Sequence, residues 1–160
     1  MLEWIANSEY ANWVNQSSGW PIALTLHAFG TATVVGLSFI IALRLLGLFR
    51  TIPFSALKTL IVFVWIGVAC QIVSGLTLWT VKPAQYLADG MFEMKMGFLL
   101  VSILVTAIMQ RTVNREAAAW ESAGTASSRG VKFVAATALL WACVTIGGRL
   151  TAYLGTLYPT

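Results

Sequence analysis

The chain has 160 residues, of which 58% are hydrophobic and only 10% are charged. Soluble domains carry roughly 25% charged residues, so this composition excludes a disordered chain, a disulfide scaffold and an ordinary cytosolic enzyme. The net charge of +4 is explained by basic loops beside membrane spans and requires no nucleic-acid partner. The remaining class is an integral membrane protein, whose partner is the lipid bilayer.

The first 16 residues predict an amphipathic helix that lies in the membrane interface. Leu2, Ile5, Trp13 and Val14 supply apolar side chains, and polar residues lie between them. The segment lacks the basic start and the small-residue cleavage site of a signal peptide. We therefore expect 1–16 to be an interfacial helix of the protein itself.

Four apolar stretches follow, and each is long enough to cross a bilayer core, which needs about 20 helical residues. They cover about 22–49, 60–81, 91–110 and 131–157. Continuous apolar runs of this length favour helices over the alternating pattern of a membrane barrel. The sequence thus predicts an all-α fold, an integral membrane four-helix bundle forming a single domain over 1–160. Residues 111–130 are expected to be a mobile cytoplasmic linker.

Basic residues are concentrated in two of the three loops between the spans. The first and third of these loops contain Arg50, Lys58, Arg111, Arg115, Arg129 and Lys132. The opposite side carries only Lys82 and Lys95, together with acidic residues. Because cytoplasmic loops are enriched in Lys and Arg, this bias predicts a multi-pass protein of a bacterial inner membrane with both termini in the periplasm.

Signatures of known catalytic sites are missing from the sequence. It contains no GxGxxG, P-loop or HExxH motif, and its single histidine, His27, cannot form a two-histidine metal site or a bis-histidine haem site within one chain. Acidic residues lie only in loops and at helix ends, which argues against a proton relay through the membrane. The pattern favours a protein without independent catalytic activity.

Polar residues of all four spans reach a similar depth on the side of the termini. His27 lies six residues beyond Pro21, about 9 Å along a helix. The candidate binding residues at this depth are His27, Gln71, Ser74, Lys95 and Arg149. Each also has a structural interpretation, because intramembrane polar groups often bond neighbouring helices. Arg44, on the other side, is expected to extend its side chain to the interface.

Met91, Met94 and Met96 open the third span on the same side as His27. Thioether and imidazole form a known axial pair for haem iron, and both also bind copper(I). One hypothesis is therefore a small redox or metal-handling protein that binds one b-type haem. His27 would ligate the metal, Met94 or Met96 would be a possible second ligand, and Lys95 and Arg149 would hold the propionates. Alternatively, two chains would each offer His27 to one haem.

A second hypothesis belongs to a different functional class. The chain would be a non-catalytic binding or scaffold subunit whose polar pocket holds a lipid, a quinone or a small anion. Small residues on the spans, such as Gly30 and Gly67, are typical of helix contacts and are compatible with a homodimer or a larger membrane complex.

Several short motifs together resemble those of an uncharacterised family of small bacterial four-span membrane proteins. They are the segment GWPIALTLHAFGTATVVGLSFIIALRLLGLF, Ile52-Pro53, Ser74-Gly75, Phe92-x-x-Lys95 and Gly148-Arg149-Leu150-x-Ala152-Tyr153. The resemblance covers most of the chain and includes His27, Arg44, Lys95 and Arg149. More distantly, the architecture is similar to that of copper-resistance D-type proteins and b561-like haem-binding bundles. Those proteins use several intramembrane histidines, whereas this chain has one.

Overall fold

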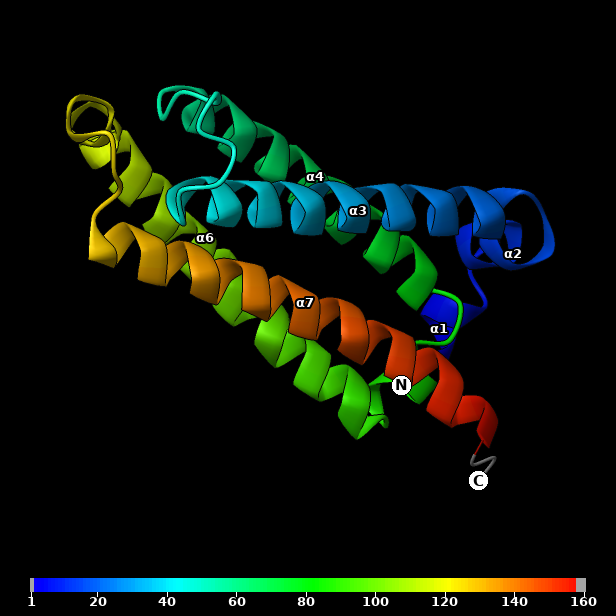
Figure 1. Cartoon of the computed structure of the whole chain (residues 1–160). Coiled ribbons are helices and arrows are strands. Elements are labelled where there is room, and N and C mark those ends of the chain that lie inside the picture. The colour runs from blue at the N-terminus through cyan, green and yellow to red at the C-terminus, as the bar shows by residue number, and fades with distance from the viewer. Residues whose placement is uncertain (1, 158–160) are drawn as a thin grey trace.

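The computed structural model describes residues 2–157, with side chains described for 2–150. Within this range the chain forms helices and no strand (Figure 1). The helices are α1 (Glu3–Ala6), α2 (Glu9–Gln16), α3 (Gly19–Leu45), α4 (Ala56–Trp79), α5 (Pro83–Leu87), α6 (Gly90–Ala123) and α7 (Ser128–Leu157). Helices α3, α4, α6 and α7 are long and apolar enough to cross a membrane. The predicted all-α four-helix bundle is confirmed.

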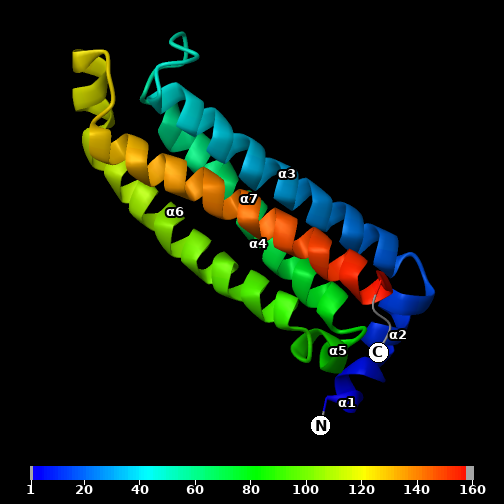
Figure 2. The same ribbon diagram turned by 60° about the horizontal axis from the view of Figure 1, so that its bottom comes forward.

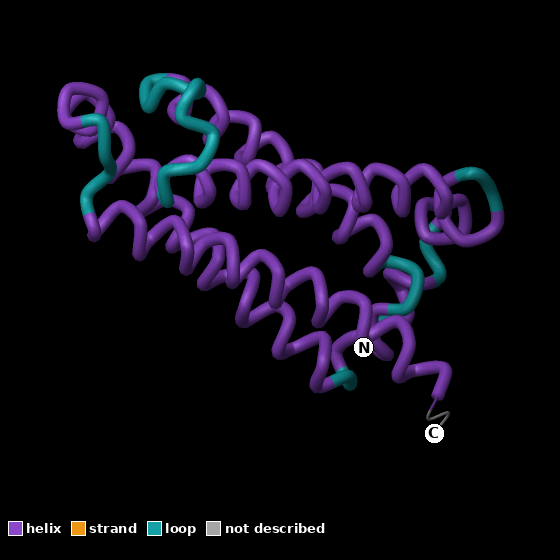
Figure 3. Tube along the Cα trace, viewed as in Figure 1, coloured by secondary structure: helices purple, strands orange, loops and turns teal. Residues whose placement is uncertain are grey.

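The bundle consists of two helical hairpins, α3 with α4 and α6 with α7, which pack together mainly through α3 and α7 (Figure 2). The connections 46–55 and 124–127 lie at one end, and the short helices α1, α2 and α5 lie at the other (Figure 3). We call residues 34–68, 102–123 and 128–144 the hairpin half. Residues 19–33, 69–79, 90–101 and 145–157 form the termini half.

The hydrophobic core lies in the hairpin half. Its largest fully buried side chains include Ile41, Phe54, Leu57, Ile61, Met109, Val134 and Trp141. The Trp141 indole N–H donates to the Thr106 hydroxyl at 3.0 Å, so the largest of these side chains is also fixed by a buried hydrogen bond. In α6, which passes through both halves, the buried residues begin only at Ser102. The termini half is therefore much less tightly packed.

Helices α3 and α4 cross closely where the two halves meet. A Cβ atom added to Gly30 would lie 2.9 Å from the carbonyl oxygen of Gly67, and one added to Gly67 would lie 3.1 Å from the carbonyl oxygen of Gly30. Both distances are shorter than ordinary van der Waals contacts, and the opposing atoms are backbone. Only glycine at these two positions lets the helices approach this closely.

The prediction that residues 111–130 form a mobile linker is wrong, because α6 continues to Ala123 and only 124–127 is loop. Ala117 and Trp120 are buried, and the Trp120 ring meets the Phe54 ring at a centroid distance of 5.8 Å. This packing extends the helix beyond the apolar span. Gly124, with φ +70°, ends it in the left-handed conformation.

The expectation that Arg44 reaches out to the interface is also wrong. Arg44 is only 6% exposed, and its guanidinium lies 3.8 Å from the centroid of the Phe54 ring. Its Nε donates to the carbonyl oxygen of Ile52. The loop 46–55 folds back over the end of α3. The guanidinium therefore contacts Phe54 and Ile52 inside the protein and does not extend to the interface.

The predicted single helix over 1–16 is divided into α1 and α2, and residue 1 lies outside the described residues. Ser8 starts the second helix, because its hydroxyl accepts a hydrogen bond from the Ala11 N–H at 3.2 Å. The Tyr10 hydroxyl lies 2.8 Å from the Thr77 hydroxyl, which links α2 to α4. The N-terminal segment thus packs against the end of the bundle that lies opposite the connections 46–55 and 124–127.

Candidate functional site

His27 of α3 faces Ser74 of α4 in the termini half. The imidazole Nδ1 and the Ser74 Oγ are 3.0 Å apart, and the His27 side chain is half-buried. Gly75 leaves room for the ring, because a Cβ atom there would lie 3.4 Å from the His27 Cε1. Two residues predicted from their depth alone are therefore in direct contact.

The hydrogen bonds around Ser74 are compatible with one particular form of the imidazole. The Ser74 hydroxyl donates to the Cys70 carbonyl at 2.6 Å, and a hydroxyl has one proton to donate. With that proton used, Ser74 accepts from an Nδ1–H of His27. In this tautomer the neutral ring has its lone pair on Nε2.

A second chain of hydrogen bonds holds the His27 backbone against α4. The Gln71 side-chain amide donates to the Thr31 hydroxyl at 3.0 Å, and Thr31 donates to the His27 carbonyl at 2.8 Å. Gln71 is buried, and its amide holds the Thr31 hydroxyl that bonds to the backbone of His27. The sequence indicated Gln71 but missed Thr31, whose only signal is its position one helical turn after His27.

Lys95 brings α6 and α7 into the same site. Its Nζ and Cε would each lie 3.4 Å from a Cβ atom added to Gly148, so the side chain lies directly over this glycine of α7. Lys95 is half-buried and close enough to His27 for a direct electrostatic interaction. Among the described side chains it has no carboxylate partner. The site therefore combines an imidazole and an uncompensated ammonium group.

The remaining predicted site residues lie on exposed faces. Met94 is 45% exposed and Met96 is 37% exposed, one on each side of Lys95 in the sequence, and Arg149 is also exposed. The structure thus groups His27, Ser74, Gln71 and Lys95. The roles of Met94 and Met96 as iron ligands and of Arg149 as a propionate partner stay predictions.

Nowhere in the described part of the chain do three or more His, Cys, Asp or Glu side chains gather as metal ligands. A zinc-type site needs three or four such ligands, whereas haem iron needs only one or two axial ligands from the protein.

Comparisons with known proteins find no matching family model, no matching curated protein and no matching solved structure. Function is therefore inferred from the chemistry of the His27 site.

Proposed function

We propose that the chain is a membrane-embedded binding protein that takes the head group of a quinol-type amphiphile between His27 and Lys95. The observation that carries this proposal is the hydrogen-bond chain from His27 Nδ1 through Ser74 to the Cys70 carbonyl. It leaves Nε2 as an acceptor, and Lys95 supplies a donor beside it. A phenolic hydroxyl, which both donates and accepts, matches this pair.

The surroundings of the site support an amphiphilic ligand. The neighbouring faces of α4 and α6 expose large apolar side chains: Val73, Leu76, Leu100 and Val101. Helices α4 and α6 also make few contacts with each other. A ligand with an apolar tail can lie along these faces while its head group reaches the polar site. Of the lipid, quinone and small anion considered from the sequence, the quinone class in its reduced form fits the donor and acceptor pair best.

The direct test is calorimetric titration of decylubiquinol, kept reduced under argon, into the detergent-purified protein. We expect His27→Ala and Lys95→Met each to weaken binding at least tenfold, because each removes one hydrogen bond to the head group. Phe29→Ala changes a side chain on the same helix that is 68% exposed and serves as the matched control. Equal affinity in all four proteins, or heat no greater than that of empty micelles, would reject the proposal.

A second candidate is the binding of one b-type haem, favoured by the same Nε2 lone pair. Ligating histidines usually donate their other N–H to a protein group, as His27 does to Ser74. His27 would hold the iron through Nε2, and Lys95 would face a propionate. When bound, the haem would supply one-electron redox chemistry.

Absorption spectra of oxidised and dithionite-reduced protein separate the two candidates. Haem binding requires a Soret band and a sharp reduced α band, both of which disappear in His27→Ala. A spectrum without these bands, from protein produced in haem-replete cells, would reject haem and leave the quinol proposal standing.

The proposal also includes the location of the site, in the periplasmic half of a bacterial inner membrane. Seven of the ten basic residues lie at or near the hairpin end, against Lys82, Lys95 and Arg149 at the other end, and this bias supports a periplasmic position for both termini. Helix α6 is the least buried of the four spans. Its exposed face supports assembly into a homodimer or a larger membrane complex.

A further inference from the structure

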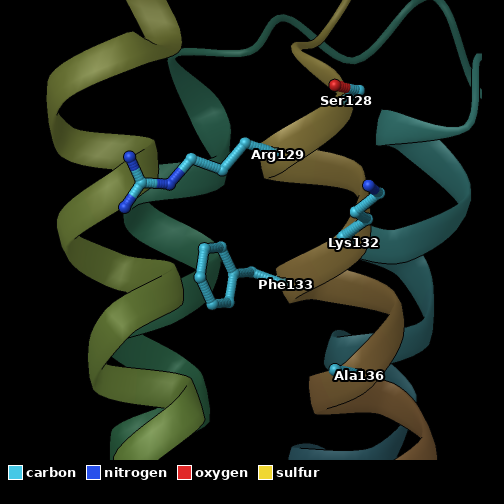
Figure 4. Close-up of a pocket in the computed structure, with 5 residues that line it drawn as sticks. All are labelled: Ser128, Arg129, Lys132, Phe133 and Ala136. Carbon is cyan, nitrogen blue, oxygen red and sulfur yellow. The ribbon is translucent and has the colours of Figure 1, made fainter.

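A basic hollow lies at the start of α7, at the opposite end of the bundle from the His27 site. It has a volume of about 490 Å³ and is lined by Ser128, Arg129, Lys132, Phe133 and Ala136 (Figure 4). Ser128, Arg129 and Lys132 are exposed, whereas Phe133 and Ala136 are half-buried. The hollow is thus cationic toward the end of the helix and apolar one turn further in.

The two cations of this hollow are not neutralised by the protein. Figure 4 shows the Arg129 side chain extended toward α6, with the Phe133 ring beneath it and Lys132 on another side of α7. The Arg129 guanidinium carbon is 5.7 Å from the centroid of the Phe133 ring. Across residues 2–150, neither Arg129 nor Lys132 has an ion-pair partner.

The nearby carboxylate of Glu116 is already engaged by other groups. It accepts hydrogen bonds from the Ser127 hydroxyl at 2.6 Å and from the Trp120 indole N–H at 3.2 Å. Ser127 belongs to the connection between α6 and α7, and Trp120 lies in the last turn of α6. Glu116 therefore stabilises this turn, and the charges of Arg129 and Lys132 remain available for an anion from outside the protein.

The position of the hollow along α7 indicates the source of that anion. Helix α7, which is long and apolar enough to cross a membrane, begins at Ser128, so Arg129 and Lys132 lie in its first turns. In a bilayer this is the level of the lipid head groups, with the acyl chains beginning one turn deeper. Phe133 and Ala136 are at that deeper level.

We propose that this hollow binds the phosphate of an anionic phospholipid, with Arg129 at the phosphate, Lys132 adding positive charge from another side of α7, and Phe133 and Ala136 against the upper acyl chain. Each Lys or Arg near a membrane surface strengthens the attraction of anionic lipid about fivefold. The proposal does not depend on the function of the His27 site, because the two sites share no residue.

The test is titration of the detergent-purified full chain with dioleoylphosphatidylglycerol, with bound lipid counted by native mass spectrometry. We expect the double variant Arg129→Gln/Lys132→Gln to bind this lipid about 25-fold more weakly, about fivefold for each charge. Arg50→Gln/Lys58→Gln is the matched control, since it removes two exposed cations at the same end from the other hairpin. The control should lose clearly less binding, because neither residue lines the hollow.

Equal losses in both double variants, or no loss in either, would overturn the proposal. If Arg129→Gln/Lys132→Gln does not fold, as judged by its helical circular dichroism, the single variant Lys132→Gln is expected to lose about fivefold. An excess of inorganic phosphate should leave lipid binding unchanged. Displacement by phosphate would show that the hollow takes a free anion, and equal binding of dioleoylphosphatidylcholine would show that it does not select charge; either result contradicts the proposal.

Discussion

The two halves of the bundle differ in how their polar side chains are buried and hydrogen-bonded. In the hairpin half, the buried polar side chains other than Ser38 bond to each other or to the backbone inside the protein. Trp141 donates to Thr106, and Trp65 donates to Gln110 at 3.0 Å. In the termini half, His27 and Lys95 are only half-buried, and the proposed tautomer of His27 has Nε2 as an acceptor for a ligand.

This difference indicates that the hairpin half contributes most of the stability and that the termini half can receive a ligand between its helices, whereas the hollow at Arg129 lies on the surface of the hairpin half. Tight packing with satisfied polar groups contributes stability, whereas a loosely packed region with unused hydrogen-bonding capacity can receive a ligand. If this division is correct, the same kind of substitution will have very different effects in the two halves.

The largest difference is expected between two tryptophans. Trp141 in the hairpin half is fully buried, and Trp79 in the termini half is half-buried. Trp141→Ala should lower the free energy of unfolding by about 3–5 kcal/mol, because it opens a cavity and leaves the Thr106 hydroxyl without its donor. Trp79→Ala should cost much less. Titration with sodium dodecyl sulfate in mixed micelles measures both, and equal costs would contradict the division.

The next largest effect is expected at the crossing of α3 and α4. Gly30→Ala places a methyl group against the Gly67 carbonyl and should cost about 1–3 kcal/mol. Gly36→Ala lies on the same helix, where a Cβ atom meets nothing within 4 Å, and should cause no loss. Thermal unfolding of the two variants in detergent makes the comparison. Similar melting temperatures for both would show that the close crossing does not limit stability.

A smaller effect is expected at the buried cation of the hairpin half. Arg44→Leu removes the contact with the Phe54 ring and the donor to the Ile52 carbonyl, and should cost about 1–2 kcal/mol. Arg50→Leu changes an exposed residue of the adjoining loop and should alter stability by less than about 0.5 kcal/mol. Unfolding titrations of both variants test this, and an Arg44→Leu protein as stable as wild type would restore the interface interpretation of Arg44.

The smallest effect is expected at two buried serines of the hairpin half. The Ser38 hydroxyl is buried and has no hydrogen-bond partner among the described residues, whereas Ser102 donates to the Phe98 carbonyl at 2.6 Å. Ser38→Ala should leave stability unchanged or raise it by up to about 1 kcal/mol. Ser102→Ala should lower it by about 0.5–1.5 kcal/mol. Denaturant titration of this pair gives the sign, and destabilisation by Ser38→Ala would point to an internal water or other partner.

The fold was predictable from the sequence because four long apolar runs have few alternatives in a membrane. Position along the helices was also enough to place His27 and Ser74 at a similar depth, and the structure brings them into contact. The length of α6 was not predictable, because the residues after Gln110 are polar by composition. The structure shows why the residues after Gln110 are helical: Ala117 and Trp120 are buried, and Trp120 packs on Phe54 of the other hairpin.

Other features depend on contacts that no local pattern encodes. Arg44 is buried because loop 46–55 folds back over it, and a sequence does not show the path of that loop. Gln71 was predicted as a binding residue, but its amide is used by Thr31 of the neighbouring helix. The contact between His27 and Ser74, on which the proposed tautomer of His27 rests, becomes visible only when both helices are in place.

The most direct test of the proposed binding site is nitrogen-15 nuclear magnetic resonance of histidine-labelled protein, since the chain contains a single histidine. At neutral pH we predict a proton on Nδ1 and a lone pair on Nε2, with a shift of the Nε2 resonance when decylubiquinol is added. A proton on Nε2 in the free protein, or a spectrum that the quinol leaves unchanged, would contradict the proposed role of His27.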